Sequence, residues 1–171
     1  MRIVSGRWRG RRLATPAGRD VRPTLDRVRE AWMSIVSPLL LDARVLDLFA
    51  GSGALGLEAL SRGAASADLV ETAPPSLKAI AENIAQLDAG DVAHVHRVDA
   101  VRFATALDAH AYDVAFADPP YEAGLSQQIA ARWLEVPFAD VLGIEHRWFE
   151  KLPGGGEQRR YGDSAITLYR N

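Results

Sequence analysis

Hydrophobic and polar positions follow two alternating rhythms from about residue 44 onward. Short β-rich apolar runs are each followed by a stretch whose apolar residues recur at helical spacing. The runs predict strands over 44–49, 68–71, 92–98, 112–117 and 141–145, and the stretches between them predict helices over 55–61, 75–87, 101–107 and 125–134. This alternation predicts a parallel sheet that is covered by helices on both faces.

The C-terminal part has a different pattern. Residues 157–161 and 165–169 are strand-like runs that flank a Gly162-Asp163 turn signal. Two such runs around a short turn predict an antiparallel hairpin. We therefore expect an α/β fold with seven strands, mostly parallel, closed by this hairpin.

The N-terminal part is predicted to be an arm in front of the core. Residues 3–6 and 11–15 can pair as a hairpin across residues 8–10. A helix follows, capped by Thr24 or Asp26 and ended by Pro38. Its apolar stripe consists of Val28, Ala31, Trp32, Ile35 and Val36. The expected division is an arm with its helix over residues 1–38 and a core over residues 39–171.

Composition excludes several classes of protein. A chain of 171 residues with 48% hydrophobic residues suits one globular domain. The chain has no cysteine, so it can form neither a disulfide framework nor a cysteine-ligated zinc site. It has no apolar run long enough to cross a bilayer and no basic-then-apolar leader. We therefore expect a cytoplasmic protein with no membrane association.

The charge is unevenly distributed along the chain. The net charge is -2, but residues 1–29 hold nine arginines against two aspartates, which leaves the remainder at -9. A basic segment at one end of a small protein favours contact with a polyanion such as nucleic acid. A solvated face or a general preference for arginine over lysine explains the same numbers, because the chain holds 18 arginines and two lysines.

A glycine-rich loop follows the first predicted core strand. Residues 45–58 read V-L-D-L-F-A-G-S-G-A-L-G-L-E, which places Gly51, Gly53 and Gly56 between a strand and a helix. This pattern lets the backbone approach a ligand closely, and it also fits a dinucleotide site. Asp47 adds negative charge before the loop, which suits a cation better than a pyrophosphate. Glu71 ends the second strand, where a carboxylate can bind both ribose hydroxyls.

Four carboxylates stand at the ends of four successive predicted strands. They are Asp47, Glu71, Asp99 and Asp118. The carboxyl ends of parallel strands line one crevice, so these side chains are expected along one edge of the sheet.

Residues 116–122 read F-A-D-P-P-Y-E, an apolar run that ends in an acid, two prolines and an aromatic ring. Asp118 and the carbonyl of Pro119 can each accept one N–H of an amino group. Together they turn the nitrogen lone pair toward an electrophilic carbon. Pro119 and Pro120 stiffen the carbonyl direction, and Tyr121 offers a stacking face worth about 1–3 kcal/mol per base. The pattern predicts a site that activates an amino group.

Several stretches together resemble one family. These stretches are M-R-I-V-S-G-x-W-R-G-R-x-L-x-x-P, R-P-T-x-D-R-V-R-E-A, A-G-S-G-A-L-G-L-E-A-L-S-R-G-A, D-P-P-Y and the late Y-G-D-S. They resemble the RsmD-type enzymes, class I S-adenosylmethionine-dependent methyltransferases with a Rossmann-like fold that modify N2 of a guanine in 16S ribosomal RNA. The resemblance extends from about residue 1 to the end.

The resemblance implies a role for each matching position. The cofactor S-adenosylmethionine would be bound by Asp47, Phe49, Gly51, Ser52, Gly53, Glu71, Asp99 and Ala100. Asp118, Pro119, Pro120 and Tyr121 would hold the guanine. RNA contact and pocket shaping would fall to Arg7, Arg9, Arg11, Arg12, Arg22, Thr24, Arg27 and Arg29.

The expected reaction is direct in-line methyl transfer without a covalent enzyme intermediate. The expected partner is 16S ribosomal RNA, within a small ribosomal subunit or an assembly intermediate, and the protein is expected to be a monomer without a metal. His94 and His96 lack a third ligand and are taken as ordinary strand residues. Alternatives are a DNA-adenine or protein-glutamine methyltransferase, a dinucleotide-binding oxidoreductase, and a non-catalytic RNA chaperone.

Overall fold

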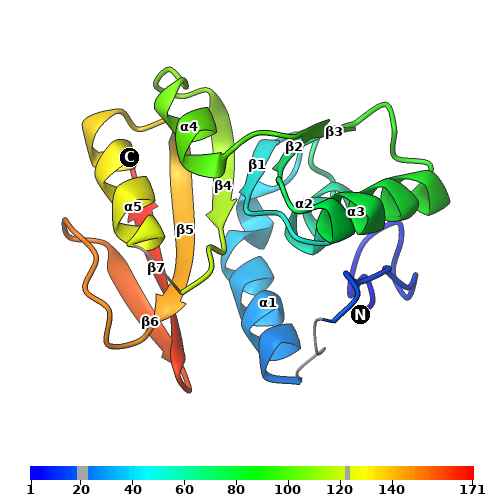
Figure 1. The fold of residues 1–171 in the computed structure, drawn as a ribbon, viewed down its shortest axis with the longest axis horizontal. Coiled ribbons are helices and arrows are strands. Elements are labelled where there is room, and N and C mark those ends of the chain that lie inside the picture. The colour runs from blue at the N-terminus through cyan, green and yellow to red at the C-terminus, as the bar shows by residue number, and fades with distance from the viewer. Residues whose placement is uncertain (19–22, 122–123) are drawn as a thin grey trace.

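The computed structural model describes residues 1–18, 23–121 and 124–171, together with the side chains of all of these except Pro23 and Thr24. Figure 1 shows helices packed against a twisted sheet. The helices are α1 (Pro23–Val36), α2 (Ala54–Ser61), α3 (Pro74–Leu87), α4 (Ala100–Thr105) and α5 (Leu125–Glu135), with a short 3₁₀ turn η1 (Ser37–Leu39). The strands are β1 (Arg44–Leu48), β2 (Ser66–Val70), β3 (Ala93–His96), β4 (Tyr112–Ala117), β5 (Ala139–Arg147), β6 (Glu157–Tyr161) and β7 (Ser164–Arg170).

The strands form one seven-stranded sheet in the order β3-β2-β1-β4-β5-β7-β6. Strands β1 to β5 pair in parallel, and β7 pairs antiparallel with both β5 and β6. The chain moves outward from β1 to β3 and then returns to place β4 on the other side of β1. This reversal creates a switch point between β1 and β4, where open α/β sheets bind their ligands. The predicted mostly parallel sheet with its antiparallel hairpin is confirmed.

Two hydrophobic cores cover the two faces of the sheet. One face packs against α1, α2 and α3, with Trp32, Leu57 and Ile80 buried. The other packs against α4 and α5, with Ala104 and Trp133 buried. Alternate strand residues supply each core because successive side chains of a strand point to opposite faces.

Most predicted elements are present, with shifted ends. Strand β5 runs two residues further at each end than expected, because its pairing with β7 continues as far as Arg147 opposite Ser164. Strand β3 is shorter than expected. Helix α4 starts at Ala100 and ends two residues early at Thr105, with the Asp99 side chain accepting a hydrogen bond from the Arg102 amide at its start.

The N-terminal segment pairs across its turn but forms no regular strand within the described residues. The Ile3 amide donates to the Arg11 carbonyl, and Arg2 forms a single antiparallel bridge with Arg12. The neighbouring amides of Val4 and Ser5 donate instead to the buried carboxylate of Glu58 on α2. This contact turns the arm onto the core and interrupts the predicted hairpin ladder.

The arm packs beside α3, as Figure 1 shows. Ile3 and Leu13 are buried in the same core as α1. Asn83 of α3 bonds both backbone groups of Ala14. The first 18 residues therefore pack closely against the core while their arginine side chains remain exposed.

No helix among the described residues combines the length and apolar character needed to cross a lipid bilayer.

Candidate active site

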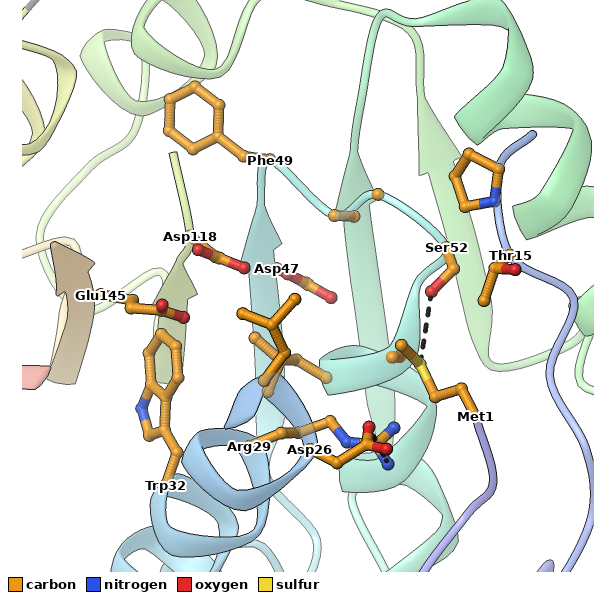
Figure 2. A pocket seen from close by; sticks show the side chains of 16 residues that line it. Met1, Thr15, Asp26, Arg29, Trp32, Asp47, Phe49, Ser52, Asp118 and Glu145 are labelled. Carbon is orange, nitrogen blue, oxygen red and sulfur yellow. Dashed lines mark hydrogen bonds and ion pairs between the residues drawn. The ribbon is translucent and has the colours of Figure 1, made fainter. Parts of the chain in front are cut away.

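A cavity of about 140 Å³ opens at the switch point, between the carboxyl ends of β1, β4 and β5 and the start of α1. Figure 2 shows its lining. The N-terminal arm contributes Met1 and Thr15, and the glycine loop contributes the backbone around Gly51 and Ser52. Three carboxylates line it from three neighbouring strands: Asp47, Asp118 and Glu145.

Strand register explains why these carboxylates share one face. Asp47 of β1 is paired with Phe116 of β4, and Phe116 is paired with Gly143 of β5. Phe116 contacts the Trp32 indole edge-on, with ring centroids 5.3 Å apart. Side chains two residues apart on a strand point the same way. The residues two positions beyond Phe116 and Gly143 are Asp118 and Glu145, so both project over the same face as Trp32.

Asp47 is an ionisable group in an apolar setting. Its side chain is 1% exposed. One oxygen, Oδ2, accepts the Gly56 N–H at 2.9 Å, while Oδ1 has no hydrogen-bond partner among the described residues. Burial raises the pKa of Asp47 to about 8, against the lowering effect of the Gly56 N–H, and nearby Glu71 raises it further. A buried acid with an orphaned oxygen fits a cationic or hydrogen-bond-donating ligand.

The glycine loop bends tightly beside Asp47. Phe49 has φ +60°, Gly51 +59° and Gly53 +80°, all in the left-handed region. A Cβ on Gly56 would lie 2.3 Å from Leu69 and 3.3 Å from the Asp47 carboxylate. The missing side chain allows α2 to approach the sheet so closely that its Gly56 amide reaches Asp47.

Two of the predicted acids stand at the same edge outside the cavity lining. Glu71 accepts the Gly51 N–H at 2.8 Å, and its second oxygen accepts the amides of Thr72 and Ala73. Asp99 is exposed and accepts the Arg102 amide at the start of α4, where Ala100 is buried. The strand order brings Asp99, Glu71, Asp47 and Asp118 into succession along one edge, as predicted.

The D-P-P-Y segment follows β4 without regular structure. Asp118 is exposed beside the cavity, Pro119 is buried and Pro120 is exposed. The Tyr121 hydroxyl donates to Glu145 Oε1 at 3.0 Å and lies 2.9 Å from Ser164 Oγ. Burial raises the pKa of Tyr121 to about 12, so the phenol stays neutral and keeps these bonds.

The Tyr121 side chain is thereby tied to Glu145, which lines the cavity. Tyr121 remains 42% exposed. The Arg147 guanidinium lies 4.9 Å from the ring centroid.

Helix α1 points one cation into the cavity. Arg29 is 8% exposed, and its Nη2 donates to the Arg2 carbonyl at 2.9 Å and lies 3.7 Å from Asp26. Its Nε and Nη1 have no hydrogen-bond partner among the described residues. A buried guanidinium with two orphaned donors fits an anionic group. Arg27 is exposed, whereas Arg22 and the Thr24 side chain lie outside the described residues.

Sequence reasoning missed Glu145 and the part of Trp32 in the cavity floor. Glu145 ends the fifth predicted strand, so the rule that selected the four other acids would also have selected it. Trp32 was expected in the core, and it is buried there, but it also lines the cavity. The arm residues Met1 and Thr15 gave no local signal because their position depends on packing between distant segments.

The two strand histidines have different surroundings. His96 bonds Asp68 at 2.8 Å, and His94 is exposed. In the described part of the chain, no three His, Cys, Asp or Glu side chains gather as a metal site would require.

Residues 1–143 match the family model described as "Conserved hypothetical protein 95". The chain belongs to this family. Its curated relatives include "Ribosomal RNA small subunit methyltransferase D" of Escherichia coli K12, which is 44% identical over 128 residues. That match covers 75% of this chain and 64% of the relative. The protein of the same name from Haemophilus influenzae is 35% identical over 130 residues, which cover 75% of this chain and 67% of the relative. The predicted RsmD-type resemblance is confirmed.

Solved structures of similar fold match nearly the whole chain. The Escherichia coli protein yhhF has a TM-score of 0.85 at 36% identity, with 99% of this chain and 97% of that chain covered. A Thermus protein, TTHA0928, has a TM-score of 0.83 at 32% identity, covering 100% and 99%. A Thermus thermophilus 16S rRNA N2 G1207 methyltransferase, solved with AdoMet and guanosine, has a TM-score of 0.67 at 19% identity, covering 90% and 44%. The fold is that of a Rossmann-like class I methyltransferase.

Proposed function

We propose that this chain transfers a methyl group from S-adenosylmethionine to the exocyclic N2 amine of a guanine in 16S ribosomal RNA. The family relatives named as small-subunit rRNA methyltransferases support the substrate. The observation with most weight is that the buried Asp47 and the D-P-P-Y acid Asp118 line one cavity. A donor bound beside the glycine loop and an amino group held by Asp118 would meet in that space.

The cavity fits the charges of S-adenosylmethionine. Bound there, the cofactor supplies a methyl group on a positively charged sulfur. We assign the orphaned oxygen of Asp47 to the cationic part of the cofactor. We assign the two orphaned donors of Arg29 to its carboxylate. Arg29 was expected among the residues that contact RNA and shape the substrate pocket, and its burial inside the cavity is the reason for assigning it to the cofactor instead.

The neighbouring strand ends supply the remaining cofactor contacts in this proposal. The loop of Phe49, Gly51, Ser52 and Gly53 approaches the cofactor through its backbone. Glu71 accepts the ribose hydroxyls, using carboxylate oxygens that now accept backbone amides. Asp99 binds the adenine amino group, with Ala100 packed behind it.

The D-P-P-Y segment holds the guanine. Asp118 accepts one N2 hydrogen and the carbonyl of Pro119 accepts the other, so the nitrogen lone pair turns toward the methyl group. Tyr121 stacks on the base, with its hydroxyl tied to Glu145 and Ser164. Alignment and electrostatic complementarity supply the rate enhancement, and no covalent intermediate with the protein is needed.

The basic arm and α1 contact the RNA backbone. Arg7, Arg9, Arg11 and Arg12 have exposed side chains on the arm, and Arg27 is exposed on α1. Arginines that contact phosphates bind RNA without reading its sequence. Recognition of a single guanine then depends on the shape of a folded RNA, within the small subunit or an assembly intermediate. The protein acts in the cytoplasm as a monomer.

One rival reaction is disfavoured by the site itself. A dinucleotide-dependent oxidoreductase would place a pyrophosphate at the glycine loop, where Asp47 adds an acid to the same cavity. That reading also leaves D-P-P-Y without a role. Titration calorimetry with NAD and with S-adenosylmethionine separates the two, and we expect heat of binding from the second alone.

The direct test is transfer of tritiated methyl from labelled cofactor to small ribosomal subunits, followed by nucleoside analysis. The proposal predicts label in N2-methylguanosine. Label in a methylated adenosine, in DNA or in protein glutamine would replace the proposed substrate with one of the alternative amino groups.

A further inference from the structure

Glu145 lines the cavity from β5, outside both the glycine loop and the D-P-P-Y segment. It is 4% exposed, near the carboxyl end of β5. The Tyr121 hydroxyl donates to its Oε1. No described residue donates a hydrogen bond to Oε2. A buried acid that lines a ligand cavity and retains acceptor capacity is suited to recognising a donor on the ligand.

Its position relative to Asp118 follows from the sheet. The last paired residues of β4 and β5 are Ala117 and Ile144, so Asp118 and Glu145 are the next pair along the two strands. Both side chains point to the Trp32 face, and Figure 2 shows both carboxylates at the same side of the cavity. A planar group whose amino nitrogen is held by Asp118 would therefore present its adjacent ring edge to Glu145.

The ring edge beside N2 distinguishes guanine from other bases. Guanine has N1–H next to its N2 amine, which gives neighbouring donors. A purine with an unprotonated N1 has an acceptor there instead. An ionised carboxylate can accept hydrogen bonds but cannot donate them. It therefore attracts the guanine edge with its neighbouring donors and repels an edge with an acceptor at N1. Asp118 and the Pro119 carbonyl use both N2 hydrogens, which leaves N1–H in need of an acceptor.

We propose that Glu145 accepts the N1–H of the target base and so makes the site specific for guanine. This inference rests on the proposed function. Tyr121 then has two linked tasks, because its ring stacks on the base while its hydroxyl fixes the Glu145 carboxylate. Ser164, from β7, supports the same hydroxyl at 2.9 Å. The stacking ring and the edge-reading acid form one hydrogen-bonded unit.

A pair of nucleotides that share the N2 amine and differ at N1 and C6 provides the test. Guanosine monophosphate has N1–H, whereas 2-aminopurine riboside monophosphate keeps the N2 amine but has an acceptor at N1. Dissociation constants for both are measured with S-adenosylhomocysteine at saturation. We expect wild type to prefer the guanine nucleotide by about 10-fold or more, equivalent to about 1.4 kcal/mol. Glu145→Gln should bring the two constants within about 3-fold, because an amide can accept from N1–H or donate to N1.

Matched variants separate edge reading from a merely structural role. Glutamine keeps an acceptor for Tyr121, so unchanged affinity for S-adenosylhomocysteine will show that Glu145→Gln is folded. Glu135→Gln makes the same change at an exposed position of α5 outside the cavity lining, so its nucleotide preference should match wild type.

Three results would overturn the inference: equal preference ratios in wild type and Glu145→Gln, loss of the preference in Glu135→Gln, or binding of neither nucleotide by wild type. The proposed function is judged separately. It would fail through absent S-adenosylhomocysteine binding or absent methyl transfer to small subunits by the wild-type protein.

Discussion

At the scale of single residues, Asp47 is an acid whose burial is only partly compensated by hydrogen bonds. Its carboxylate has one backbone donor and an orphaned second oxygen, in a setting that disfavours charge. Ionising it without a ligand therefore costs folding free energy. The glycine pattern predicted a ligand at this place, but the degree of burial depends on how closely α2 packs at Gly56.

This cost predicts a specific pH dependence. The folded pKa of Asp47 is about 8 and the ordinary value is 3.8, so its neutral form favours the folded state. That contribution is complete below pH 3.8 and is lost as the pH rises toward 8. Asp47→Asn cannot ionise, so its advantage in unfolding free energy over the ligand-free wild type should grow from pH 5 to pH 8, by about 1.4 kcal/mol per pH unit at most.

Urea denaturation at pH 5, 6.5, 8 and 9 measures this difference. The matched control is Asp113→Asn, since Arg44 lowers the pKa of Asp113 and its contribution is constant over this range. A difference between Asp47→Asn and wild type that does not vary with pH would contradict the burial argument.

Single residues also mark where prediction from sequence ends. The acids Asp47 and Asp118 could be assigned to one crevice because strand ends in a parallel sheet share an edge. The burial of Arg29 could not be foreseen, because an arginine in a basic stretch gives the same local signal whether it faces solvent or a cavity. Its direction is set by the packing of α1 through Trp32, a contact between segments about 110 residues apart.

At the scale of elements, the position of α1 depends on one glycine in β5. A Cβ on Gly143 would lie 2.4 Å from Trp32 Nε1 and 2.8 Å from the next indole atom. Trp32 is 1% exposed and fixed against Phe116, so it has little room to move. Arg29 lies one turn earlier on α1, so this contact also sets where the Arg29 guanidinium enters the cavity.

We therefore expect Gly143→Ala to destabilise the protein by about 1–3 kcal/mol, as overpacking of a buried contact does. It should also weaken S-adenosylmethionine binding by shifting α1. Thermal unfolding and calorimetry measure the two effects. Gly90→Ala is the matched control, because no atom lies within 4 Å of its added Cβ. Equal behaviour of the two variants would show that α1 is placed by other contacts.

The elements themselves were largely predictable, and their departures have physical causes. The alternating strand-like and helical patterns predicted both ends of β4 correctly, and the C-terminal hairpin pattern predicted both ends of β6. The predicted N-terminal hairpin is reduced to one β-bridge because the amides of Val4 and Ser5 donate to the Glu58 carboxylate instead of pairing across the hairpin. Long-range hydrogen bonds of this kind leave no mark in local sequence.

At the scale of the whole molecule, the N-terminal arm combines positive charge with close packing against the core. The arm of residues 1–18, which holds five arginines and no acidic residue, packs against α2 and α3. Its apolar residues Ile3 and Leu13 are buried and its arginines are exposed. This arrangement presents a basic surface near the C-terminal ends of α2 and α3, where the Arg7 amide donates to the Ser61 carbonyl and the Arg11 guanidinium donates to the Gln86 carbonyl. When arginines bind phosphates in this way, the slope of log K against log salt grows with the number of RNA phosphates that they neutralise.

Replacing Arg7, Arg9, Arg11 and Arg12 together with glutamine should flatten the salt dependence of RNA binding. If each contacts one phosphate, the slope of log K against log salt should fall by about 3. Filter binding of transcribed 16S ribosomal RNA between 50 and 200 mM salt, a range of about fourfold, measures it. The control replaces four exposed arginines elsewhere: Arg97, Arg159, Arg160 and Arg170. Equal slopes for the two quadruple variants would remove the arm from the RNA interface.

The most direct test of the central claim is the single-turnover rate of methyl transfer to small ribosomal subunits by Asp118→Ala. Because we propose that Asp118 holds the amino group that receives the methyl group, the rate should fall by about 10²–10³-fold or more. Affinity for S-adenosylhomocysteine should stay within about 3-fold, and the exposed control Asp108→Ala should react like wild type. An Asp118→Ala protein that methylates at a rate comparable to wild type would contradict the account.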